Sequence, residues 1–333
     1  MIRKLLIFLL IVLIVSAVFG AAAWRDYRQF ADQPMAAGGT AVVWVRPGDS
    51  LGAVVERLER LGLASVGWQW RLLGRLERPV IKAGEYRVHA GESPAELLAR
   101  MDRGDVVRHR FTIVEGWNLA RLRAELEHDS RIESAVAGLG PEALMQRLGC
   151  EGCFAEGWFL PETYQFVRGD RDLDLLARAH RAMQRELEQA WAQRTPDHPL
   201  ETPEELLVLA SLVELEAVVA EERDQVAGVF VRRLNRGMRL QTDPTVVYGI
   251  TGDFDGRIRR VHLRTDHPWN TYTRGGLPPT PIALPGAAAI HAAAQPADGN
   301  ALYFVARGDG THQFSATLAE HNRAVARYIL GRE

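Results

Sequence analysis

Two glutamates, Glu214 and Glu216, interrupt a run of Leu, Val and Ala between positions 206 and 220 whose only other polar residue is Ser211. The run follows Thr-Pro-Glu-Glu at 202–205, and Thr202 as N-cap with Glu205 at the third helical position forms a capping box. We therefore predict a helix over 206–220. Apolar residues cover all its sides, which indicates a buried helix. Because a bare charge is costly to bury, a carboxylate on it must be paired or functional.

Glu216 is the better candidate for acid–base chemistry. The two carboxylates lie about 200° apart on a helix that turns about 100° per residue, so they cannot act as a facing pair. Glu216 shares its face with leucines and valines, whereas Glu214 lies on a smaller and more polar face. Desolvation should therefore raise the pKa of Glu216 more and keep it protonated near neutral pH, as a general acid requires. The alternative is a core glutamate that accepts backbone hydrogen bonds or pairs with Arg223 or Arg232.

Four hydrogen-bonding residues in Gly/Pro-rich or turn-like surroundings are candidates for binding a substrate near this acid: Gln241, Asp243, Asn270 and Tyr272. Loops on a rigid scaffold commonly carry binding residues. The alternative is that they only make turns, since Asp-Pro and Asn-Thr are ordinary turn dipeptides.

Several other chemistries find no support in the sequence. The net charge of −2 lacks the basic excess that binding to a phosphate backbone requires, so no nucleic-acid partner is expected. The ten histidines show no His-Glu-x-x-His and no paired metal spacing, and neither a Gly-x-Ser-x-Gly motif nor a phosphate-binding loop occurs. We expect neither a catalytic metal nor a cofactor. Cys150 and Cys153 are predicted to form a structural disulfide, with two free thiols as the alternative.

The N-terminal segment predicts a membrane anchor over residues 1–24. Residues 5–24 are 20 uncharged and mainly apolar residues, about the number needed to cross a hydrocarbon core. The flanking charges weakly favour an N-terminus inside and the rest of the chain outside. A signal peptide cleaved near the alanines at 21–23 is the alternative, although the apolar run is longer than usual for one. Residues 25–39 are predicted to be a linker, because 31–39 lack periodicity.

A small domain is predicted over residues 40–108. A β-rich run at 41–45 stops at Pro47-Gly48, and apolar residues then recur at helical spacing up to position 61. Ser93, with Glu96 three residues later, predicts a capping box and a helix start. The stretch from 42 to 61, with Val-x-x-Gly-Asp-Ser-Leu at 45–51, resembles the start of a LysM domain, a βααβ module that binds N-acetylglucosamine-containing glycans. The alternative is an ordinary turn that caps a helix.

The remainder, residues 109–333, is predicted to be one larger domain. It opens with a strand near 111–114 and contains a helix over about 173–192 before the buried helix.

Several motifs of this larger domain resemble the endolytic murein transglycosylases of the MltG/YceG-like family. They are LASLVELE at 209–216, ERD at 222–224, GMRLQTDPTVVYG at 237–249, NTY at 270–272, GLPP at 276–279, LYFVA at 302–306 and HN at 321–322. The resemblance implies an α+β chain with an N-terminal transmembrane helix, a small LysM-like βααβ domain and a larger mixed α+β catalytic domain. It also implies that the catalytic residue is the second Glu of a Glu-x-Glu pair, here Glu216. One departure is Ala217, where the family is expected to have Thr.

The activity implied by the resemblance is that of a lyase that cuts the β-1,4 bond between N-acetylmuramic acid and N-acetylglucosamine inside nascent peptidoglycan strands. The single glutamate acts as acid and then as base, and 1,6-anhydro ends form. The implied location is the inner membrane, in a single pass, with the bulk of the chain in the periplasm and peptidoglycan synthases as partners. A muramidase that uses water and a non-catalytic wall-binding scaffold are the alternatives.

Overall fold

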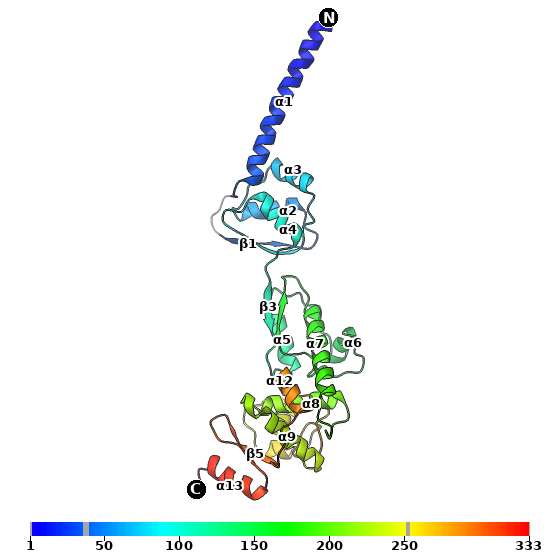
Figure 1. The fold of residues 1–333 in the computed structure, drawn as a ribbon, viewed down its shortest axis with the longest axis vertical. Coiled ribbons are helices and arrows are strands. Elements are labelled where there is room, and N and C mark those ends of the chain that lie inside the picture. Colours follow the sequence, from blue (N-terminus) through cyan, green and yellow to red (C-terminus); the bar gives the residue numbers. More distant parts are fainter. Residues whose placement is uncertain (1, 36–39, 251–253, 333) are drawn as a thin grey trace. The chain divides into compact units, whose positions relative to one another are not determined.

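A computed structural model describes residues 2–35, 40–250 and 254–332 of the chain, and it has mixed α+β architecture (Figure 1). The chain divides into two compact units. The first, which we call the small unit, runs to His109 and includes Phe166–Gly169. The second, which we call the large unit, comprises Arg110–Gln165 and the chain from Asp170 onward. The expected boundary at 108/109 lies next to this division, apart from the four residues at 166–169.

The small unit contains α1 (Ile2–Asp32), β1 (Ala41–Val45), α2 (Leu51–Arg60), α3 (Trp68–Glu77), β2 (Gly84–Val88) and α4 (Pro94–Arg103). The chain continues with β3 (His109–Thr112), α5 (Leu119–His128), α6 (Pro141–Arg147), β4 (Thr163–Phe166), α7 (Asp172–Ala192), α8 (Pro203–Glu216), the 3-10 helix η1 (Ala220–Glu222), α9 (Arg223–Asn235), α10 (Asp243–Gly249), α11 (Arg260–Arg264), α12 (Ala287–Ala294), β5 (Tyr303–Ala306), β6 (His312–Ser315) and α13 (Leu318–Tyr328).

The first helix is long and apolar enough to cross a membrane, and its apolar part is exposed to solvent in the structure. It runs past the apolar run into the small unit, where Tyr27 and Ala31 are buried in the hydrophobic core together with Met35. Phe30 packs edge-on against Trp70 of α3, with ring centroids 5.3 Å apart. The prediction of a linker over 25–39 is therefore wrong for residues 25–32, because α1 continues through them and buries Tyr27 and Ala31. Residues 36–39 lie outside the described part of the chain.

The small unit has the order β1-α2-α3-β2, and its two strands pair antiparallel with Ala41 opposite Val88. Ser50 caps α2 by accepting from the Ala53 N–H. The capping box predicted at Ser93 is confirmed, because the Ser93 side chain accepts from the Glu96 N–H and the Glu96 carboxylate accepts from the Ser93 N–H. These caps satisfy amide groups that a helix start otherwise leaves unpaired.

The large unit is built around α8, which packs against α7, α9, α10 and α12. All residues from Leu206 to Val213 are buried, as the apolar run predicts. Two further strand pairs, β3 with β4 and β5 with β6, lie at other points of the chain. Thr202 caps α8 by accepting from the Glu205 N–H, but the Glu205 carboxylate accepts from the Glu201 N–H instead of completing the expected box.

The predicted end of α8 at position 220 is wrong. The helix ends at Glu216, where Ala217 leaves helical geometry with φ −88° and ψ 87°. An apolar run indicates which residues are buried, but it does not show where the backbone leaves the helix. The apolar run therefore extends beyond the last residue of α8. The early end has a chemical consequence, because it places Glu216 in the last turn of the helix.

Candidate active site

Glu216 is the last residue of α8, and its side chain is half-buried. Burial raises the pKa of its carboxyl, and the nearby charge of Asp243 acts in the same direction. The C-terminal end of a helix carries a partial negative charge, which also disfavours a carboxylate there. These effects favour the protonated form of Glu216, which is the direction that the sequence analysis expected.

Thr242 holds the Glu216 carboxyl in place, since its hydroxyl donates a hydrogen bond to Glu216 Oε1. Thr242 is itself buried, and its backbone N–H donates to Thr271 Oγ1 at 3.1 Å. Its carbonyl accepts from Thr245 Oγ1 at 2.7 Å. The sequence analysis did not identify this residue. Its position before Asp243-Pro244 suggests a helix cap, yet its side chain makes no cap hydrogen bond to α10 and is directed to Glu216 instead.

Asp243 and Tyr272 lie beside this pair and contact each other. The Tyr272 hydroxyl donates to Asp243 Oδ1 at 2.5 Å. Burial and the Asp243 carboxylate raise the pKa of Tyr272, so the phenol keeps its proton. Asp243 and Tyr272, two of the four predicted binding residues, therefore contact each other. They lie close enough to Glu216 to interact with its charge.

The other two predicted binding residues differ from each other. Gln241 is exposed next to Thr242, with a left-handed φ of 51° and its N–H donating to the Thr271 carbonyl at 3.3 Å. Asn270 is fully buried. Its amide donates to the carbonyls of residues 262, 263 and 265, and its Oδ1 accepts from the Tyr272 N–H at 2.9 Å. In this position the Asn270 side chain is inaccessible and shapes the loop that carries Tyr272.

Glu214 has the structural role that was the alternative for Glu216. Its side chain is only 6% exposed, its Oε2 accepts from the Gly286 N–H at 2.9 Å, and its Oε1 lies 3.8 Å from Arg223 Nη2. Burial raises the pKa of Glu214 as well, while the Gly286 hydrogen bond acts against this. A paired carboxylate at the start of α12 explains why this glutamate is tolerated in a buried helix.

Glu222 and His312 form a further pair near the acid that the sequence analysis did not identify. His312 is buried, its Nδ1 lies 2.8 Å from Glu222 Oε2, and its backbone N–H also donates to that carboxylate. Positive charge on His312 lowers the pKa of Glu216. The Glu-Arg-Asp run at 222–224 was quoted only as part of a motif, and no local spacing pointed to a histidine 90 residues away.

Within residues 2–35, 40–250 and 254–332, no group of three or more His, Cys, Asp or Glu is arranged to hold a metal ion. Cys150 and Cys153 form a disulfide, with Cα atoms 5.6 Å apart. This agrees with the predicted structural role for the pair.

The chain matches the model of the YceG-like family over residues 43–327. It is 30% identical over 265 residues to the endolytic murein transglycosylase of Bacillus subtilis, with 74% of this chain and 73% of that relative covered. It is 26% identical over 360 residues to the endolytic murein transglycosylase of Streptococcus pneumoniae D39, with 97% of this chain and 65% of the relative covered. A crystal structure of a yceG-like protein from Listeria monocytogenes has the same fold, with a TM-score of 0.52 and 24% identity over 86% of this chain and 99% of that one. This chain therefore belongs to the YceG-like family.

Proposed function

We propose that this protein is an endolytic murein transglycosylase, a lyase that acts on peptidoglycan, with Glu216 as its single acid–base residue. The observation that carries the proposal is the environment of Glu216, a half-buried carboxyl with a raised pKa held by Thr242. The relatives named endolytic murein transglycosylase support the same activity.

The reaction follows from one carboxyl used twice. Protonated Glu216 donates its proton to the glycosidic oxygen, and the bond from that oxygen to C1 of N-acetylmuramic acid breaks. The Glu216 carboxylate then accepts the proton of the 6-hydroxyl of the same sugar, whose oxygen bonds to C1 and closes a 1,6-anhydro ring. No water is consumed. General acid–base help of this kind is typically worth about 10²–10⁴-fold in rate.

Asp243 is the observation that most favours the alternative function, a muramidase that uses water. Glycoside hydrolases usually place a second carboxylate across the scissile bond. Its charge acts on Glu216, but its Oδ1 already accepts from Tyr272. We assign Asp243, Tyr272 and the exposed Gln241 to substrate binding.

The decisive experiment is mass spectrometry of products from uncrosslinked glycan strands incubated with the full-length chain in detergent micelles. We expect anhydro-muramyl ends, and a loss of about 10²–10⁴-fold in rate for Glu216→Gln. Glu204→Gln, an exposed position on the same helix, is the matched control. Reducing ends in place of anhydro ends would support the muramidase, and equal rates for wild type and Glu216→Gln would remove Glu216 as the acid. No cleavage by either would leave the scaffold.

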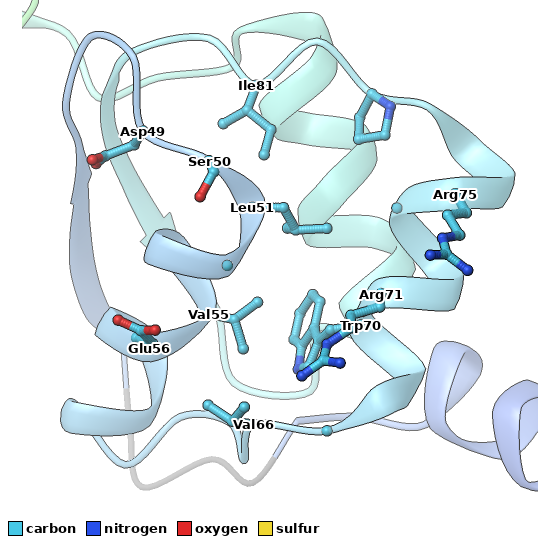
Figure 2. Close-up of a pocket in the computed structure, with 14 residues that line it drawn as sticks. Asp49, Ser50, Leu51, Val55, Glu56, Val66, Trp70, Arg71, Arg75 and Ile81 are labelled. Carbon is cyan, nitrogen blue, oxygen red and sulfur yellow. The ribbon is translucent and has the colours of Figure 1, made fainter.

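We also propose that the small unit binds glycan as a LysM-like domain. A cavity of about 620 Å³ lies between the turn before α2 and the face of α3, and Leu51, Val55 and Trp70 point into it (Figure 2). Glu56 and Arg71 also line this cavity and are exposed, so their carboxylate and guanidinium groups are available to the hydroxyl and N-acetyl groups of a glycan. Loss of chitin-oligosaccharide binding on Arg71→Ala, which changes an exposed residue of the cavity, tests this site.

The apolar helix α1 and the proposed substrate support a location at the inner membrane. We place α1 across the inner membrane with both units in the periplasm, where uncrosslinked strands emerge. Accessibility of single cysteines at positions 2 and 330 to a membrane-impermeant thiol reagent tests the orientation. The association with peptidoglycan synthases is a prediction of the family resemblance, and co-purification from solubilised membranes tests it.

A further inference from the structure

The large unit contains a cavity of about 920 Å³ to which the proposed reaction assigns no role. It is bounded by the first residues of α6, the turn at 151–156, Tyr248 at the end of α10, and Trp269 and Thr280. A cavity of this size falls in the range of small-molecule sites and has room for more than one sugar ring.

The aromatic wall of this cavity is held rigid by hydrogen bonds. The Trp269 indole N–H donates to Thr280 Oγ1 at 2.9 Å, and its ring meets Tyr248 edge to face with centroids 5.5 Å apart. The Tyr248 hydroxyl donates in turn to Glu156 Oε2 at 3.1 Å. Since these side chains are already fixed, little conformational entropy is lost when a ligand packs on them.

Phe154 forms the rim of the cavity and is 61% exposed. It follows the four-residue turn that the disulfide of Cys150 and Cys153 closes. An exposed aromatic ring on a cross-linked turn contributes little to the core, so its position beside a cavity suggests contact with a ligand.

The charge of the cavity restricts what it binds. Three acidic residues line the cavity: Glu142, Glu151 and Glu156. None of the described residues that line it is Lys, Arg or His. Anionic ligands, including the carboxylate-rich peptide stems of peptidoglycan, are therefore disfavoured. Aromatic faces combined with carboxyl and amide groups suit a neutral ligand rich in hydroxyls.

The cavity and the acid are built from the same two segments. Helix α10 begins at Asp243, beside Glu216, and carries Tyr248 into the cavity wall near its other end. The loop that places Tyr272 against Asp243 also contains Trp269. A ligand in the cavity therefore lies one short helix away from the reacting centre.

From these observations we propose that this cavity is a saccharide subsite that binds N-acetylhexosamine rings of the glycan strand away from the bond that is cut. The proposal rests on the proposed function for the identity of the strand. In this subsite, sugar rings stack on Trp269 and Phe154. The Glu156 side chain forms hydrogen bonds with their hydroxyl or N-acetyl groups.

The test uses Phe154→Ala in the full-length chain in detergent micelles, because the side chain is exposed and its loss should leave the fold intact. We expect the KM for uncrosslinked glycan to rise about tenfold with kcat changed less than about twofold, since a lost stacking contact of about 1.4 kcal/mol is one factor of ten. Phe154→Tyr keeps the ring and should restore the KM. Leu318→Ala, an exposed apolar residue outside the cavity, is the control.

Binding of N-acetylchitotetraose, measured by calorimetry, separates this proposal from the proposed function. We expect Phe154→Ala to lose one class of binding site that Arg71→Ala, in the small unit, retains. A wild-type KM together with wild-type binding in Phe154→Ala would overturn the subsite while leaving the transglycosylase intact. If wild type fails to cleave, the binding measurement alone decides the subsite. Binding of a lysine-containing stem tripeptide at this cavity in place of the sugar would also overturn it.

Discussion

Replacing Glu156 with glutamine should make the large unit more stable at alkaline pH. Burial raises the pKa of Glu156 from 4.5 to about 7, although the Leu119 N–H and the Tyr248 hydroxyl donate to its carboxyl and act against the rise. Between these two values the folded protein holds a proton that the unfolded chain has lost. Wild-type stability therefore falls as the pH rises through this window, and is constant above about pH 7.

The size of the effect follows from the difference in pKa. A shift of about 2.5 units at 1.36 kcal/mol per unit corresponds to about 3 kcal/mol. Glutamine does not ionise in this range, so the variant should gain that amount relative to wild type between pH 4.5 and 8. If the glutamine amide forms weaker hydrogen bonds than the carboxyl, the cost is independent of pH. It lowers the stability of the variant by the same amount at every pH. For a unit of this size the gain corresponds to roughly 6–12 °C in Tm.

Differential scanning fluorimetry of both proteins in the same micelles, at pH values from 4.5 to 9, measures the difference in Tm. Glu151→Gln is the matched control, because it removes an exposed carboxyl from the same cavity. A Tm difference between Glu156→Gln and wild type that does not change with pH would show that the carboxyl is well solvated. The reasoning from burial would then be refuted.

Three further predictions concern the acid and the turn beside the cavity. Asp243→Asn removes a charge that raises the pKa of Glu216, so the alkaline limb of the kcat/KM profile should move to lower pH. Thr242→Val removes a hydrogen bond that lowers that pKa, so the limb should move to higher pH, and shifts of both variants in the same direction would contradict this. Gly157→Ala should destabilise the large unit by several kcal/mol in urea unfolding, because φ is +86° and a Cβ would lie 2.5 Å from Pro281; wild-type stability would show that this close approach is not required.

The candidate site could be predicted in part from local pattern. The apolar run around Glu216 predicted a buried helix, on which a carboxylate is unusual. Thr202 and Ser93 were correctly predicted as N-caps of two helices. The apolar segment at 5–24 indicated a membrane span, and α1 has the length and composition for one. Each of these conclusions depends on residues within one or two helical turns, where side-chain spacing and backbone capping are linked directly.

Contacts between distant segments depended on the tertiary structure. Thr242 reaches Glu216 across 26 residues, and His312 meets Glu222 across 90, and neither pairing leaves a periodic signal. Asn270 has the composition of a binding residue, but its burial turns it into a support for the loop. The two glutamates of α8 differ in their partners, since Gly286 and Arg223 meet Glu214 and Thr242 meets Glu216. Sequence spacing thus determined which carboxyls are buried, whereas packing decided which partners each carboxyl meets.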